Sequence, residues 1–195
     1  MQFSYPSVQQ KNRKQLSAYF YAVLSDGTTE GNRAAFFMIA TFMAILVILY
    51  GLVQANAPRI LRASQRSEAD LIGAARTWGW GLAAVPVMLT LAAVTATEQQ
   101  MWLTLALVIG LLIFGAVFAV NSSLHSYLIL TFTKAERVTM DVGFYYMANA
   151  GGRLAGTLLS GLTYQAGGLA LMLGTAAGMV AASAITVGFL KRGEH

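Results

Sequence analysis

The chain has 195 residues, of which 56% are hydrophobic and 11% are charged, and its formal net charge is +5. Soluble domains have about a quarter of their residues charged, so this composition excludes an ordinary soluble domain and predicts an integral membrane protein. The sequence has no cysteine, which excludes disulfides, thiolate metal sites and cysteine nucleophiles. The basic residues lie between apolar blocks, so we interpret them as topology signals and expect no nucleic-acid partner.

Residues 1–33 differ from the rest because they are polar and basic, with Lys11, Arg13 and Lys14 close together. Their longest apolar run, 16–24, is too short for a membrane-spanning helix, which needs about 20 residues. No small-residue cleavage pattern follows, so a signal peptide is not indicated. We expect a soluble or interfacial leader, and one interpretation is that it is not native to the rest of the chain.

The remainder predicts an all-α integral membrane bundle over residues 34–190, followed by a tail at 191–195. About five transmembrane helices are expected, at 34–55, 77–96, 101–121, 142–164 and 169–190. We expect Pro58 to end or bend the first helix and Pro86 to kink the second. The third helix is expected to continue beyond its apolar block, and residues 165–168 are expected to form a short return.

The basic residues predict the orientation of these helices. Arginines follow the first span, Lys134 and Arg137 follow the third, and Lys191 begins the tail, while the two intervening returns carry no positive charge. The positive-inside rule therefore places the C-terminus in the cytoplasm. Five spans would put the basic leader outside, against the same rule, so we expect that a span before Ala34 is missing and that the chain is incomplete.

The fourth predicted span contains an arginine near its middle, since Arg153 lies about 16 Å beyond Val142 on a helix. Polar residues at spacings of three and four share one helical face with it: Tyr146, Asn149, Arg153, Thr157, Ser160 and Tyr164. We call this set the polar stripe. A guanidinium in the hydrocarbon core is costly, so the polar stripe is expected to border a protein interior or a wet cavity, as the wall of a solute pathway does.

Small residues recur every four positions in the last two spans, which lets another helix approach closely. The residues assigned to helix packing are Gly152, Gly156, Ser160, Gly174 and Gly178. We interpret both ladders as mainly packing devices that can also let helices rock against each other. Tyr145 is interpreted as part of an interfacial aromatic belt.

Three segments are long and unusually polar for membrane helices: YGLVQANAPRILR at 50–62, NSSLHSYLIL at 121–130 and GFYYMANAGGRLAGTLLSG at 143–161. With the basic loops and short returns, they resemble the C-terminal half of a major facilitator superfamily transporter, and more narrowly the organoarsenical efflux permeases, the ArsJ family. The resemblance covers about 34–190, while the N-terminal half and the seventh helix of that fold are absent.

This resemblance implies secondary efflux, driven by protons or another ion, of an organoarsenical such as 1-arseno-3-phosphoglycerate across the bacterial inner membrane. It implies a small anionic organic substrate, a lipid bilayer environment and no cofactor. It also implies that the missing N-terminal half of the transporter is a partner, because such substrate sites lie between two halves.

Arg153 is the first candidate for substrate contact, because a guanidinium binds tetrahedral anions through paired donors. Pairing with an acid or carbonyl of a neighbouring helix is the alternative. Asn149, one turn earlier, can orient Arg153, bind the same anion or make an interhelical hydrogen bond, and Asn121 and Tyr146 complete the predicted substrate-binding set. His125 can titrate near neutral pH, so it is a candidate for proton coupling or a structural hydrogen-bonding residue.

Two other classes of function are alternatives to transport. A non-transporting membrane assembly subunit would dock onto a partner through the small-residue helix faces. An intramembrane enzyme would need a serine–lysine pair, paired aspartates or clustered metal ligands, and the predicted spans contain neither lysine nor aspartate. We therefore expect no enzymatic activity, no catalytic residue and no metal.

Overall fold

The computed structural model describes residue 24 and residues 27–62, 67–96, 100–133 and 137–189. These residues contain helices and no strand, and the helices are α2 (Thr29–Leu61), α3 (Glu68–Thr95), α4 (Met101–Phe132) and α5 (Val138–Gly188). All four are long and apolar enough to cross a membrane. Most of the predicted leader and the tail at 191–195 lie outside the described residues.

The first helix, α2, is longer than the predicted span at 34–55. Thr28 caps its N-terminus, where a threonine oxygen accepts a hydrogen bond from a backbone N–H of the first turn. The helix then continues through Pro58, which therefore does not end it. It ends where Arg62 adopts a left-handed conformation with φ of 48°, a common way to stop a helix.

Local chemistry also sets the bounds of α3 and α4. Ser67 and Asp70 form a capping box, in which each side chain accepts a hydrogen bond from the backbone N–H of the other. The helix continues through Pro86, whose carbonyl accepts a hydrogen bond of 2.7 Å from the hydroxyl of Thr90. The expectation that the third helix continues past residue 121 is confirmed, because α4 extends to Phe132.

The last helix, α5, contains both the fourth and the fifth predicted spans, with a break between them. At Gly167 the φ and ψ angles are −144° and 17°, and at Gly168 they are 69° and −157°. The second pair lies in a region that residues with a Cβ rarely adopt, so glycine is needed there. The break divides α5 into a first part, 138–166, and a second part, 169–188.

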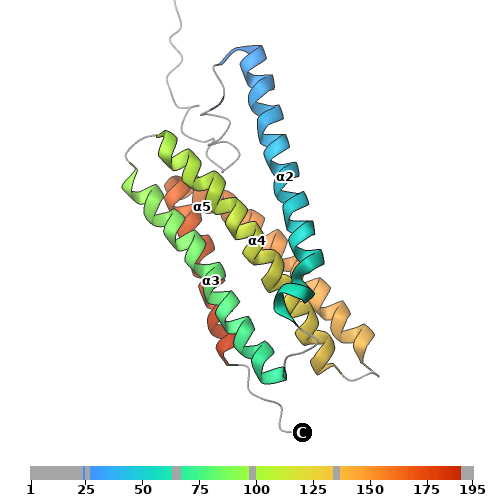
Figure 1. Cartoon of the computed structure of the whole chain (residues 1–195). Helices are drawn as coiled ribbons and strands as arrows, with labels where there is room; N and C mark the ends of the chain where they lie inside the picture. Colours follow the sequence, from blue (N-terminus) through green and yellow to red (C-terminus); the bar gives the residue numbers. More distant parts are fainter. Residues whose placement is uncertain (1–23, 25–26, 63–66, 97–99, 134–136, 190–195) are drawn as a thin grey trace, which may run out of the picture.

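The first part of α5 runs antiparallel to α4. Near its start, the hydroxyl of Tyr145 lies 3.3 Å from that of Ser126, in the last third of α4. Near its end, Tyr164 is buried in a cluster with Leu103, in the first turn of α4. Figure 1 shows this part in orange behind α4.

The second part of α5 returns along α3, also antiparallel. An added Cβ on Gly174 would lie 3.5 Å from the methyl group of Thr90, near the end of α3. The carbonyl of Gly188 accepts a hydrogen bond from Arg76, in the first third of α3. The chain therefore reverses direction at Gly168, and Figure 1 shows the red second part beside α3.

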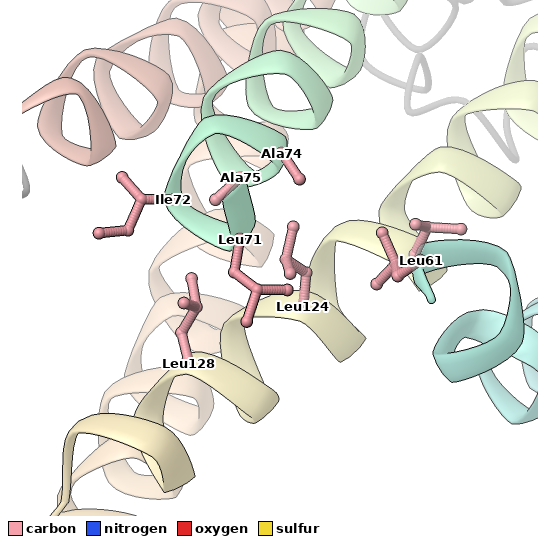
Figure 2. Close-up of a cluster of buried hydrophobic side chains, with 8 residues drawn as sticks. Leu61, Leu71, Ile72, Ala74, Ala75, Leu124 and Leu128 are labelled. Atoms are coloured by element: carbon pink, nitrogen blue, oxygen red, sulfur yellow. The ribbon is translucent and has the colours of Figure 1, made fainter. Parts of the chain in front are cut away.

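Two apolar clusters hold the helices together. At one end of the bundle, the first cluster contains Leu61 of α2, Leu71, Ile72, Ala74 and Ala75 of α3, and Val120, Leu124 and Leu128 of α4. Figure 2 shows Leu71 pointing toward Leu124 and Leu128. At the other end, the second cluster contains Leu89, Leu103, Leu107, Tyr164, Met172 and Leu173. α4 therefore joins α2 to α3 in the middle of the bundle (Figure 1).

Much of the outer surface is apolar, which suits lipid better than water. On α2, Phe37 is 68% exposed, and Val47 and Ile48 are each 62% exposed. An exposed apolar surface of this kind marks a contact with membrane or with another protein. Four long apolar helices with such a surface indicate a membrane protein.

Candidate functional site

The polar stripe lies on the first part of α5. Helical geometry continues through this part, so residues three and four apart share a face. Tyr146, Asn149, Arg153 and Thr157 are exposed, whereas Tyr164 at the end of the stripe is buried in the second cluster. Most of the polar stripe is therefore uncovered, and only its last residue is packed inside the bundle.

Arg153 has no side-chain partner among the described residues, since neither a hydrogen bond nor an ion pair reaches its guanidinium. The backbone carbonyl of Arg153 accepts a 2.9 Å hydrogen bond from the hydroxyl of Thr157. The acid on the same helix, Asp141, lies in the first turn of α5, about 18 Å away along the axis at about 1.5 Å per residue. The exposed Arg153 can thus be reached by an anion or an acidic side chain from outside the described residues.

Asn121 and His125 lie elsewhere, on α4. Asn121 is only 7% exposed and is the one polar residue in the buried set of the described chain. Its Oδ1 atom and the Nε2 atom of His125 are both buried and have no hydrogen-bond partner among the described residues. Within the predicted substrate-binding set, Asn121 is thus buried on α4, whereas Tyr146, Asn149 and Arg153 are exposed on α5.

The four glycines assigned to helix packing have different surroundings. A Cβ added at Gly174 would make an ordinary contact with Thr90 of α3. Cβ atoms added at Gly152, Gly156 or Gly178 would meet nothing within 4 Å. Ser160, the fifth assigned residue, is half-buried. The ladder on the first part of α5 therefore has no helix against it in the described chain.

One polar contact between α4 and α5, at Ser126, was not predicted from the sequence. Ser126 donates a 3.0 Å hydrogen bond to the carbonyl of Ser122 and also lies 3.3 Å from the hydroxyl of Tyr145. This contact links α4 to α5 and gives Tyr145 a role inside the bundle, where the sequence indicated an aromatic belt. The signal in the sequence was the serine pair four residues apart, which places both hydroxyls on one face of α4.

A cluster of metal-ligating side chains is not present among the described residues. The described residues hold no group of three or more His, Cys, Asp or Glu side chains that could hold a metal ion. At the polar stripe, the neutral side chains can form hydrogen bonds, and the one guanidinium can also pair with a negative charge.

Comparison with protein-family models, with curated proteins and with solved structures finds no match to this chain.

Proposed function

We propose that this chain is part of a secondary transporter of the major facilitator type, which effluxes an organoarsenical such as 1-arseno-3-phosphoglycerate. In this proposal the polar stripe of α5 lines the substrate pathway. The observation that carries it is Arg153, an exposed arginine without a side-chain partner among the described residues. It lies in the middle of the first part of α5, a helix that is apolar enough to cross a membrane. A guanidinium facing lipid is costly, so a polar pathway or a protein surface must cover this face.

The proposal has each part of α5 cross the membrane separately, which makes about five spans. At about 1.5 Å per residue, the first part is about 44 Å long and the second about 30 Å, and the hydrocarbon core is about 30 Å thick. The antiparallel contacts of Gly174 with Thr90 and of Gly188 with Arg76 support the reversal. Basic residues at the end of α2, Arg59 and Arg62, and at the start of α5, Arg137, support a cytoplasmic C-terminus in a bacterial inner membrane.

Within this pathway, Arg153 would bind the charged groups of the substrate. Paired N–H donors suit tetrahedral oxyanions such as phosphate and arsenate. Asn149, one turn earlier on the same face, would add a neutral donor, and Tyr146 a hydroxyl. Asn121 would contact substrate and His125 would couple protons only if α4 also borders the pathway, because neither lies on the polar stripe.

The test is transport by the chain joined to the N-terminal half that this proposal requires, measured as arsenic efflux from cells that make the organoarsenical. Arg153→Lys keeps the charge but loses paired donation, so a clearly weaker apparent affinity is expected at equal protein level. Arg137→Lys is the matched control, because Arg137 lies outside the polar stripe at the N-terminal end of α5. An unchanged affinity in Arg153→Lys would contradict the proposed role.

A second candidate is a membrane assembly subunit that does not transport. The observation that favours it is the uncovered small-residue face at Gly152 and Gly156, beside Arg153. A partner helix could approach closely there and supply a carboxylate to the guanidinium. In that case Gly156→Leu would abolish co-purification of the partner, and no arsenic efflux would depend on the chain.

A further inference from the structure

The polar residues at 121–126 of α4 differ in whether their side chains have hydrogen-bond partners. Ser126 has two polar neighbours, the carbonyl of Ser122 and the hydroxyl of Tyr145. On the same helix, Asn121 and His125 each have a buried polar atom, Oδ1 and Nε2, with no hydrogen-bond partner among the described residues. Buried polar atoms of native proteins are nearly always hydrogen-bonded. We therefore expect each of these two atoms to have a hydrogen-bond partner beyond the described residues.

The helix itself is a poor source of that partner. In the interior of a helix, backbone N–H groups already donate to carbonyls four residues earlier, so none is left for the Oδ1 acceptor of Asn121. Asn56 on α2 shows what the helix can offer, since its Nδ2 donates to the carbonyl of Leu52 at 2.8 Å. A backbone carbonyl can accept from a side-chain donor in this way, but it cannot donate to a side-chain acceptor such as Oδ1. The missing group must therefore carry an O–H or N–H donor from outside the α4 backbone.

The spacing of the two residues suits a single small bridging group. Residues four apart on a helix have Cβ atoms about 5–6 Å apart on the same face. Because both side chains extend from the same face, one oxygen atom between their polar ends can make two hydrogen bonds of about 2.8 Å each. One O–H group can donate to Oδ1 of Asn121 and accept from an N–H at Nε2 of His125, which meets both requirements at once.

The surroundings favour a small and tightly held group. Val120, Leu124 and Leu128 on the same helix belong to the first apolar cluster and are almost fully buried. In apolar surroundings an unmet hydrogen bond is especially costly, so a bridging group is retained once it enters. Asn121 lies about 30 Å along α4 from Met101 at about 1.5 Å per residue, toward the helix end where water is near.

We propose that Asn121 and His125 together bind one internal water molecule, which bridges Oδ1 of Asn121 and Nε2 of His125 beside the first apolar cluster. This site is separate from the polar stripe of α5 and does not depend on the proposed transport function. It makes the pair a hydrated polar position inside an apolar bundle, held by two side chains of one helix.

The test is a nuclear magnetic resonance measurement on the full chain in lipid bilayers with labelled histidine nitrogens. The sequence has two histidines, so His195→Gln leaves His125 as the only source of signal. Magnetisation transfer from water protons to Nε2 of His125 is expected in this parent protein. Asn121→Leu should abolish the transfer, whereas Asn56→Leu, which removes an exposed amide from α2, should leave it intact.

The parent measurement decides the matter even if Asn121→Leu does not fold. Absence of water transfer to Nε2 in the parent would overturn the proposal. Transfer from carbon-bound protons of lipid or detergent would also overturn it, because the bridging group would then be an organic hydroxyl. A protonated Nε2 that depends on Asn121 but receives no transfer from water would indicate a direct bond between the two side chains, with the same consequence.

Discussion

The guanidinium of Arg76 on α3 donates a 2.9 Å hydrogen bond to the carbonyl of Gly188, the last residue of α5. The two residues are 112 positions apart in the sequence. The last carbonyls of a helix have no partner within it, and a cation there also interacts favourably with the helix dipole. This contact therefore anchors the returning end of α5 to the start of α3.

Replacing Arg76 by alanine should loosen that anchor. The expected cost is about 1 kcal/mol of unfolding free energy, because the hydrogen bond is charge-assisted but exposed. Faster amide hydrogen exchange should appear at residues 184–188 and not in α2. Arg33→Ala is the matched control, since Arg33 is an exposed arginine on α2. Equal exchange in the two variants would show that the contact does not anchor α5.

The antiparallel packing of α3 and the second part of α5 can be trapped by a disulfide. An added Cβ on Gly79 would lie 3.5 Å from the Cβ of Ala184, and disulfides need Cβ atoms about 3.5–4.5 Å apart. The chain has no cysteine, so Gly79→Cys with Ala184→Cys introduces the only thiols. We expect nearly complete oxidation under mild conditions, measured as loss of free thiol.

Gly81→Cys with Ala184→Cys is the control for that disulfide. An added Cβ on Gly81 would meet nothing within 4 Å, because this position lies on a different face of α3. The control pair should stay reduced under the same conditions. Equal oxidation of both pairs would show that the two helices do not hold the register described above.

The contact between α3 and α4 depends on a glycine. A Cβ added at Gly110 would lie 2.6 Å from Cδ2 of Leu89, closer than real Cβ atoms come. Gly110→Val should therefore lower the unfolding free energy by about 1–3 kcal/mol, the usual cost of overpacking. Denaturant titration in detergent measures it, and adding Leu89→Ala should recover part of the loss.

Gly178→Ala is the comparison for that variant, because an added Cβ there meets nothing within 4 Å. Alanine also has the higher helix propensity, so the unfolding free energy should stay the same or rise slightly. If Gly110→Val were as harmless as Gly178→Ala, the close approach of α3 and α4 at Gly110 would be wrong.

The reversal within α5 depends on Gly168, whose φ is 69° and ψ is −157°. Side chains with a Cβ avoid this region, so Gly168→Ala should cost about 1–3 kcal/mol of unfolding free energy. Gly156→Ala is the control, because Gly156 is helical and an added Cβ there has open space. Combined with the cysteine pair at Gly79 and Ala184, Gly168→Ala should also slow disulfide formation. Unchanged stability and oxidation would contradict the turn.

Periodicity and composition predicted the helices of this structure and the residues that share one face of α5. The long apolar blocks predicted membrane-spanning helices, and four helices of suitable length and apolarity are present among the described residues. The spacing of Tyr146, Asn149 and Arg153 placed them on one face, which the helical geometry of α5 bears out. Bounds were less well predicted, since α2 passes through Pro58, whose ring removes one N–H without preventing the next turn.

By itself, the sequence determined the helical class, the apolar blocks and the grouping of polar residues on α5, because these follow from side-chain hydrophobicity and the helical repeat. Only the tertiary structure decided which polar residues are covered. It buries Asn121 and leaves Arg153 exposed, although both were candidates for the same site. It also brings Arg76 of α3 against Gly188 at the end of α5. Burial and long-range contacts depend on how helices pack around each other, and the sequence of one helix does not contain that information.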